Sequence, residues 1–247
     1  MSGYSGATYD CNGHQYVRVS SVLGLLDKGY GLAKWKDNIV KAKLSDDYYK
    51  LLSKGHEIDI DLLLDAALRQ PNTVRDARGT QGTNIHDALE ALLDVNKDHS
   101  SFMPEYATLF ENAQQWILEA KLEPVHIEAR LCSHAHEYAG TVDLICYQEY
   151  NGEKQVALID FKTGSSVYDT STLQLAAYAH AYKELNQDKP ELWPDICYIM
   201  HVNRDTYKFK ETKHMHRYNT TTKRFEIEEA FAVFKALRAC YKWRSGK

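Results

Sequence analysis

Residues 138–182 read YAGTVDLICYQEYNGEKQVALIDFKTGSSVYDTSTLQLAAYAHAY, and they determine the fold that we expect for the rest of the chain. The stretch contains two apolar runs, residues 140–146 and 156–162, whose aliphatic and β-branched side chains favour buried strands. The polar segment between the runs contains Asn151-Gly152, which is a strong signal for a hairpin turn. The sequence therefore predicts two buried antiparallel strands joined by a short turn.

Each predicted strand carries a carboxylate where a core residue would be expected, Asp143 in the first strand and Asp160 in the second. Asp160 and Lys162 are two residues apart, so their side chains point to the same face of the strand. A buried carboxylate without a partner costs free energy, so these acids should meet a cation. Two acids beside a lysine suit a divalent metal ion bound through oxygen, with the ammonium stabilising a reacting group. The alternative is a buried Asp–Lys ion pair that only stabilises the sheet.

The segment after the second strand, residues 170–185, has its apolar and small residues at helical spacing. Gln174 and Tyr178 are four residues apart in this predicted helix and therefore share one face. A polar pair on one face, shortly after the Asp-Phe-Lys-Thr-Gly sequence that begins at Asp160, is more than ordinary amphipathicity predicts. Gln174 and Tyr178 are therefore candidate site residues.

An upstream helix is expected at residues 83–95, capped by Thr83 and separated from the preceding helix by the sequence Gln-Pro-Asn at 70–72. His86 lies at the edge of its apolar stripe, one turn before Glu90. A single histidine in such a place is more often a packed core residue than a ligand. The acids and lysine downstream favour a site role for His86 instead.

These motifs resemble the PD-(D/E)XK nuclease superfamily, and within it the RecB-like exonuclease branch of phage and bacterial type. The resemblance is carried by Gly-Thr-Val-Asp143, Ile-Asp160-Phe-Lys162-Thr-Gly and Gln174-Leu-Ala-Ala-Tyr178, in that order. That branch also has a histidine on an upstream helix after Gly-Thr, which fits Gly82-Thr83-Asn-Ile-His86. The resemblance covers residues 78–182, and a weaker similarity to the start of phage-encoded members is present at residues 16–23 and 32–35.

The resemblance implies an α/β fold, with a restriction-endonuclease-like core whose mixed central β-sheet is flanked by helices, plus an N-terminal helical part. The expected order along the chain, helices followed by three strands, a helix, two strands and a helix, fits such a core independently. Residues 1–77 are expected to form an N-terminal hairpin and helical part, and residues 78–247 the nuclease core. The two parts are expected to make one compact unit.

The resemblance also implies the roles of the site residues. Asp143, Asp160, His86 and the backbone carbonyl of Phe161 would bind Mg²⁺ or Mn²⁺. Lys162 would orient the attacking water or stabilise charge on the phosphate, and Gln174 and Tyr178 would position the lysine or the nucleic acid strand. Two further acids are second-rank candidates, Glu128 on the first predicted strand of the sheet and Glu90 on the helix of the histidine.

The implied activity is that of a Mg²⁺-dependent exodeoxyribonuclease, which hydrolyses phosphodiester bonds in single-stranded DNA or at duplex ends, in recombination, repair or phage DNA processing. A structure-selective endonuclease is the alternative enzyme. A non-cleaving nucleic-acid-binding module on the same fold is the alternative of another class. The acids Asp143 and Asp160 argue against it, because a pure binder has no need of buried carboxylates that repel phosphate.

The charge of the chain is unevenly distributed. The 247 residues carry a net charge of −4, but residues 204–247 carry +7. This segment is a candidate DNA-binding surface or, equally, a solvated outer face. Four residues in it are the candidate phosphate contacts: Lys208, Lys210, Lys213 and Arg217.

The five cysteines are scattered and form no Cys-x-x-Cys pair, and their odd number argues against a disulfide framework. Cys240 stands alone near the C-terminus, so no iron–sulfur cluster is expected. The first nine residues lack the apolar core of a signal peptide, and no apolar run is long enough to cross a membrane. A cytoplasmic location is therefore expected, in a bacterial cell or a phage-infected host. DNA is the expected partner and no membrane association is expected. The sequence does not identify any protein partner.

Overall fold

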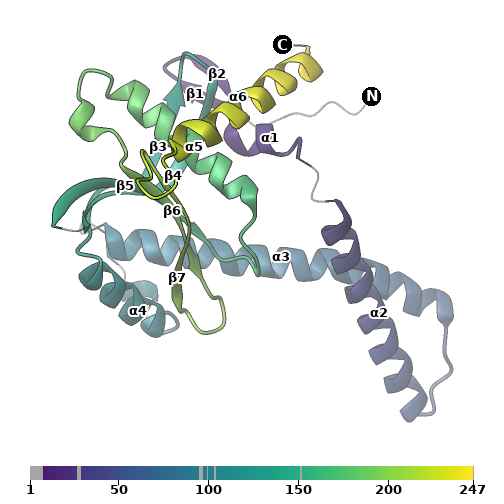
Figure 1. Ribbon diagram of the computed structural model, residues 1–247. Helices are drawn as coiled ribbons and strands as arrows, with labels where there is room; N and C mark the ends of the chain where they lie inside the picture. Colours follow the sequence, from purple (N-terminus) through teal and green to yellow (C-terminus); the bar gives the residue numbers. More distant parts are fainter. Residues whose placement is uncertain are drawn as a thin grey trace. The chain divides into compact units, whose positions relative to one another are not determined.

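The computed structural model describes residues 8–26, 29–94, 97–98, 100–102, 104–150 and 152–246, with the side chain of Tyr30 excepted (Figure 1). The chain divides into two compact units. One consists of Met1–Leu26 together with Ile85–Lys247, and the other of Asp27–Asn84. The segment 1–77, expected to form one N-terminal part, is thus shared between the units, because its hairpin joins the central sheet.

The larger unit is built on one sheet of seven strands. Its order is β1-β2-β4-β5-β6-β7, with β3 paired to β4. The pairs β2–β4 and β5–β6 are parallel and the other pairs are antiparallel, so the sheet is mixed as expected. The strands are β1 (Thr8–Cys11), β2 (His14–Arg18), β3 (Glu123–Ser133), β4 (Tyr138–Tyr150), β5 (Glu153–Lys162), β6 (Ile196–Val202) and β7 (Phe209–His216).

Strands β4 and β5 form the centre of the sheet because their apolar runs are covered on both faces. Leu144 pairs with Ile159 and Ile145 with Leu158, and all four are buried. A strand buried on both faces reads as a continuous apolar run, which is the pattern of these two segments. Gly152, in the connection between the strands, has a positive φ of 80°, whereas the other residue of the predicted turn lies outside the described residues.

Helices cover the two faces of this sheet (Figure 1). Leu175, Phe231 and Phe234 belong to the core on one face, which is built from α1, α5 and α6. Ile85 and Leu109 belong to the core on the other face, which is built from α4 and the last part of α3. The helices are α1 (Val19–Leu23), α4 (Ala107–Glu119), α5 (Asp169–Leu185) and α6 (Glu226–Ser245), with 3₁₀ turns η1 (Ser100–Phe102) and η2 (Pro190–Leu192). The predicted fold class is confirmed.

The smaller unit contains α2 (Gly29–Ser53) and the first part of α3 (Ile60–Leu93). The predicted end of a helix at residues 70–72 and the predicted cap at Thr83 are both wrong, because α3 continues through Pro71. Thr83 Oγ1 bonds back to the carbonyl of Gly79 at 3.2 Å, inside the helix. A proline removes one N–H donor from a helix. In a helix as long as α3, the backbone hydrogen bonds before and after Pro71 keep the segment helical.

The expectation that the chain lacks disulfides is wrong. Cys11 of β1 is bonded to Cys132 of β3, which is 121 residues away in sequence. The hairpin β1–β2 reaches β3 because Val17 pairs with Tyr138 at the start of β4, where β3 also ends. The odd number of cysteines misled the prediction, since the other three remain as free thiols. None of the described helices combines the length and apolar character needed to span a membrane.

The disulfide should stabilise the fold, because it closes a long loop in the unfolded chain. We predict that reduction, or Cys11→Ser, lowers the free energy of unfolding by ~2–4 kcal/mol. Thermal melts with and without dithiothreitol measure this. Cys240→Ser, at an exposed free thiol, is the matched control and should leave the midpoint unchanged. Identical midpoints for the wild type in both conditions would contradict the prediction.

Candidate active site

Asp143 lies in β4 with its carboxylate between β5 and the end of α3. Its Oδ2 atom accepts a hydrogen bond from the backbone N–H of Phe161 in β5. The same oxygen lies 3.8 Å from Nδ1 of His86 in α3, and the side chain of Asp143 is 13% exposed. The ring of His86 meets the ring of Phe161 edge-on, with centroids 6.3 Å apart. Residues that are far apart in sequence, on a helix and two strands, therefore meet at one point.

Glu128 joins this group from β3. Its neighbours Ile127 and Ala129 pair with Leu144 and Val142, so Glu128 lies opposite Asp143 on the adjacent strand. Its backbone has a positive φ of 50°, a conformation that is unusual for a residue with a side chain. His86, Glu128 and Asp143 each offer one ligand atom, and these atoms lie within 4.8 Å of one another. Glu128, expected only as a second-rank candidate, is thus one of the three potential metal ligands that the fold brings together.

Asp160 and Lys162 contact each other directly on β5. Oδ2 of Asp160 and Nζ of Lys162 form an ion pair, in which the Asp160 side chain is 2% exposed and the Lys162 side chain 29% exposed. The two residues are two apart on one strand, so the predicted common face is the reason for their contact. Asp160 also acts electrostatically on His86 and Asp143, which places it in the same cluster of charges.

Gln174 and Tyr178 lie on α5, four residues apart as predicted, and Gln174 Nε2 donates to the Tyr178 hydroxyl at 2.8 Å. The Tyr178 ring passes so close to β4 that a Cβ added at Gly140 would lie 2.4 Å from its Cε1 atom. Gly140 is therefore required for the ring to reach its place. Gly140 was not among the predicted site residues, although it begins the Gly-Thr-Val-Asp motif.

The acids of the cluster are held in an unfavourable environment for charge. Burial first, and then the neighbouring Asp160, raise the pKa of Asp143 well above its usual range. Burial, followed by the charge of Glu90, raises the pKa of Glu128. A metal ion would relieve this repulsion, because it stabilises the ionised form of each carboxylate.

The two basic groups of the cluster respond in opposite ways. Burial lowers the pKa of His86, so its imidazole is neutral at pH 7 and can offer a nitrogen lone pair to a metal ion. Burial alone would also lower the pKa of Lys162, but Asp160 and Asp143 outweigh it and raise this pKa above its ordinary value. Lys162 therefore remains an ammonium ion.

The donor set fits a hard divalent cation. It combines the carboxylates of Glu128 and Asp143 with one neutral imidazole, and oxygen-rich sets of this kind suit Mg²⁺ or Mn²⁺. A single ammonium, Lys162, does not neutralise three clustered acids, since it is paired with Asp160. The backbone N–H of Phe161 donates to Asp143 in this set, and the role of the Phe161 carbonyl as a ligand stays a prediction.

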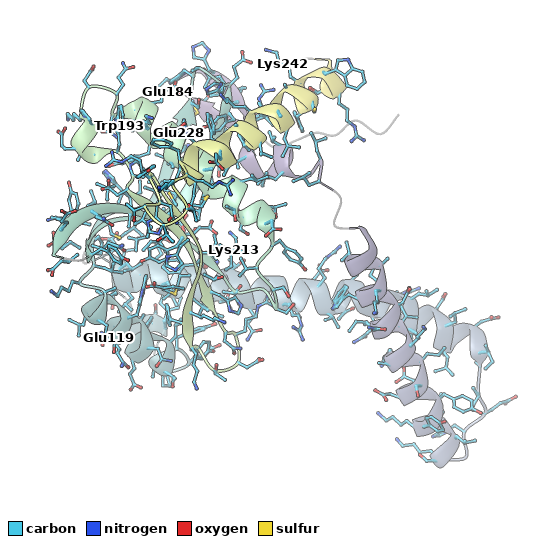
Figure 2. The ribbon with its side chains drawn as sticks, in the orientation of Figure 1. Glu119, Glu184, Trp193, Lys213, Glu228 and Lys242 are labelled. Atoms are coloured by element: carbon cyan, nitrogen blue, oxygen red, sulfur yellow. A yellow bond between two sulfur atoms is a disulfide. The ribbon has the colours of Figure 1, made fainter. Side chains whose placement is uncertain are left out.

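The other predicted residues are not among the three converging donors, although the charge of Glu90 acts on Glu128. Glu90 accepts a bond from Lys97 Nζ at 2.5 Å. Lys213 is paired with Asp169 at 2.7 Å, and Arg217 is paired with Asp195, so two of the four candidate phosphate contacts already bind acids. In Figure 2, Lys213 on β7 and Lys242 on α6 lie far from each other, so these two lysines do not belong to one basic patch.

Comparison with known proteins supports the family suggested by the motifs. The family model of the PD-(D/E)XK nuclease superfamily matches residues 96–246, well over half of the chain. The matched region includes Glu128, Asp143, Asp160 and Lys162, and it begins after His86. No curated protein sequence matches the chain.

The raised pKa values have a consequence for stability. A folded state in which the pKa of Asp143 is raised binds protons more readily than the unfolded state, so stability falls as pH rises above about 4 towards the folded pKa. We predict that Asp143→Asn, in EDTA at pH 8, melts a few degrees above the wild type, since ~1 kcal/mol corresponds to ~2–4 °C in a chain of this size. The difference should shrink as pH is lowered, and Mg²⁺ should raise the midpoint of the wild type more than that of the variant.

The control for this measurement is Asp169→Asn. Asp169 is an exposed acid whose pKa is lowered by its hydrogen bond to Lys213, so neutralising it should not raise the midpoint. A wild type that is more stable than Asp143→Asn in EDTA at every pH would show that the Asp143 carboxylate is not under electrostatic stress.

Proposed function

The chain belongs to the PD-(D/E)XK nuclease superfamily, and from this premise we propose that it is a metal-dependent exonuclease of the RecB-like branch that hydrolyses phosphodiester bonds of DNA. The observation that carries the proposal is the convergence of His86, Glu128 and Asp143, with ligand atoms within 4.8 Å of one another. The Asp160–Lys162 pair acts on the same cluster. A role in DNA recombination, repair or phage DNA processing belongs to the same proposal.

Five groups would hold the metal ion in this proposal. Glu128, Asp143 and His86 would supply the converging donors, and Asp160 and the carbonyl of Phe161 would be further oxygen ligands. A bound Mg²⁺ or Mn²⁺ supplies a more acidic water molecule and stabilises negative charge on the phosphate oxygens. The His86 imidazole is already neutral, so it does not have to lose a proton before it binds a metal ion.

Lys162 acts as a charge rather than as a base. Its pKa is raised by Asp160 and Asp143, so it keeps its proton at neutral pH. An ammonium held beside the acids donates hydrogen bonds to a non-bridging phosphate oxygen, where negative charge develops in the transition state. Asp160 fixes the direction of that ammonium through their direct contact.

Gln174 and Tyr178 position the other groups. Burial raises the pKa of the Tyr178 hydroxyl, so it stays neutral and can donate a hydrogen bond while it accepts one from Gln174. The ring of Tyr178 is buried against Gly140, which favours positioning over stacking on a nucleic acid base. We propose that the pair maintains the orientation of Lys162 and Asp160 on the neighbouring strand.

The approach of the DNA backbone needs positive charge near the cluster. Lys208 and Lys210 are exposed and have no carboxylate partner among the described residues, so they are available for phosphate contacts. Lys213 and Arg217 would first have to exchange their acidic partners for phosphate. Among the four candidates, Lys208 and Lys210 therefore fit a phosphate contact better.

We predict that Asp160→Ala lowers the rate of DNA cleavage by about a hundredfold or more, because it removes a metal ligand and the partner of Lys162. Single-turnover cleavage of a labelled oligonucleotide in Mg²⁺ measures the rate, and circular dichroism checks the fold. Asp188→Ala changes an exposed aspartate outside the cluster and should cleave like the wild type. Near-normal cleavage by a folded Asp160→Ala would refute the assignment of the site.

The choice between exonuclease, endonuclease and binding module is tested with linear and circular DNA. We predict that linear DNA is degraded from an end in Mg²⁺, that covalently closed circles survive, and that EDTA stops the reaction. Oligonucleotides labelled at the 5′ or the 3′ end give the polarity. Nicking of the circles would indicate the endonuclease instead, and binding without cleavage of any substrate would indicate the non-cleaving module.

A further inference from the structure

Two arginine guanidinium groups pack against the ring of Tyr9, which lies in the N-terminal hairpin. The Arg18 guanidinium carbon lies 5.0 Å from the centre of the Tyr9 ring, and that of Arg130 lies 5.3 Å from it. The Tyr9 hydroxyl is hydrogen-bonded to Thr141 Oγ1 at 3.0 Å. These residues come from β1, β2, β3 and β4, so the fold assembles the group from distant parts of the sequence.

The group lies beside the candidate active site. Arg130 and Thr141 pair with each other on β3 and β4. Each is two residues from an acid of the cluster, Glu128 and Asp143 respectively. Two residues of a strand span ~7 Å. Arg130 is therefore about one step along its strand from the acids between which a scissile phosphate would be held, and Arg18 reaches the same side through their shared contact with the Tyr9 ring.

Neither guanidinium is neutralised. Arg18 and Arg130 are exposed, and neither forms a salt bridge with a carboxylate among the residues that the structure describes. The surface arginines Arg217, Arg224 and Arg238 differ, because each contacts a carboxylate. Two like charges on one ring repel each other, so an anion between or beside them would be stabilised.

We propose that Arg18 and Arg130 bind a nucleic acid backbone phosphate next to the scissile phosphate, with Tyr9 holding both guanidinium planes in position. This inference rests on the proposed nuclease function, and it names the residues that grip the substrate beside the cleavage point. The planar guanidinium presents its donors in a fork that matches phosphate oxygens in a bidentate manner. Both an internal phosphodiester and a terminal phosphate monoester offer this chemistry.

The backbone that carries Tyr9, Arg18 and Arg130 is held by strand pairing and a disulfide, which favours a phosphate-binding site over a flexible surface contact. The Cys11–Cys132 disulfide joins β1 to β3, two residues from Tyr9 and two residues from Arg130. Arg18 is held by the pairing of β2 with β4, opposite Ala139. A binding site on paired strands with a covalent tether loses little conformational entropy when the ligand binds.

Binding in EDTA tests the proposal separately from cleavage. The full chain is titrated against a fluorescent oligonucleotide, and Kd is measured over a range of salt concentrations. We expect Arg18→Gln and Arg130→Gln each to raise Kd about tenfold or more, and to reduce the magnitude of the salt slope by about one. Tyr9→Leu should weaken binding similarly, whereas Tyr9→Phe, which keeps the ring, should weaken it less. Arg224→Gln is the matched control, with its guanidinium already bound to Glu229.

A set of oligonucleotides with one neutral methylphosphonate linkage locates the contact. At the contacted linkage, the methylphosphonate should raise the Kd of the wild type. The same substitution should not raise the Kd of Arg18→Gln or Arg130→Gln further, because these variants have already lost the contact. Comparison of phosphorylated and hydroxyl ends separates the two sources. Loss that depends on the end group indicates a terminal phosphate, and loss that does not depend on it indicates an internal diester.

These experiments distinguish failure of the proposed phosphate contact from failure of the proposed nuclease function. If both arginine variants bind like Arg224→Gln, with an unchanged salt slope, the arginines only cover the Tyr9 ring and the inference is overturned. This holds whether or not the wild type cleaves DNA. If the binding losses occur as expected but the wild type cleaves nothing in Mg²⁺, the phosphate contact stands and the nuclease function fails. Melting midpoints confirm that each variant is folded.

Discussion

The crowding of three acids against one ammonium is the constraint on which the rest of the structure depends. Glu128, Asp143 and Asp160 come from three adjacent strands, and Lys162 forms its direct ion pair with Asp160 while it interacts with Asp143 only through its charge. Such a cluster lowers the stability of the fold in the absence of a cation. The surrounding sheet, with apolar layers on both faces, must therefore be stable enough to hold it. If the cluster binds a metal ion as proposed, part of this cost in folding stability is recovered when the ion binds.

The centre of the sheet and the acids on it could be predicted from sequence because the signals are local. Apolar runs mark β4 and β5, and a carboxylate within such a run has few explanations other than a site. The spacing of Gln174 and Tyr178 likewise fixed a common helical face. The pairing of Arg130 with Thr141, and the approach of Tyr178 to Gly140, depend on which strands and helices become neighbours. No short stretch of sequence contains that information.

The features that were predicted wrongly also depend on long-range contacts that local sequence does not reveal. Pro71 and Thr83 are local signals for helix ends, but the backbone hydrogen bonds on either side of them prevail in α3. Counting cysteines could not reveal the bond between Cys11 and Cys132, because their proximity follows from the pairing of β2 with the start of β4. Glu128 was only a second-rank candidate because the resemblance alone suggested it, and no local signal in its strand supported it. The register of β3 against β4 is what places it opposite Asp143.

The parallel pairing of β2 with β4 also sets the timing of folding during synthesis. Val17 can pair with Tyr138 only after the ribosome has added 121 further residues, and the same number separates Cys11 from Cys132. At ~5–20 residues per second, the N-terminal hairpin waits about 6–24 s for its partner strand. During that time it is an unprotected pair of strands with an unpaired cysteine, exposed to wrong pairing and to disulfide formation with other molecules. A chaperone or a reducing environment at this early stage would therefore act on the first strands before the rest of the central sheet exists.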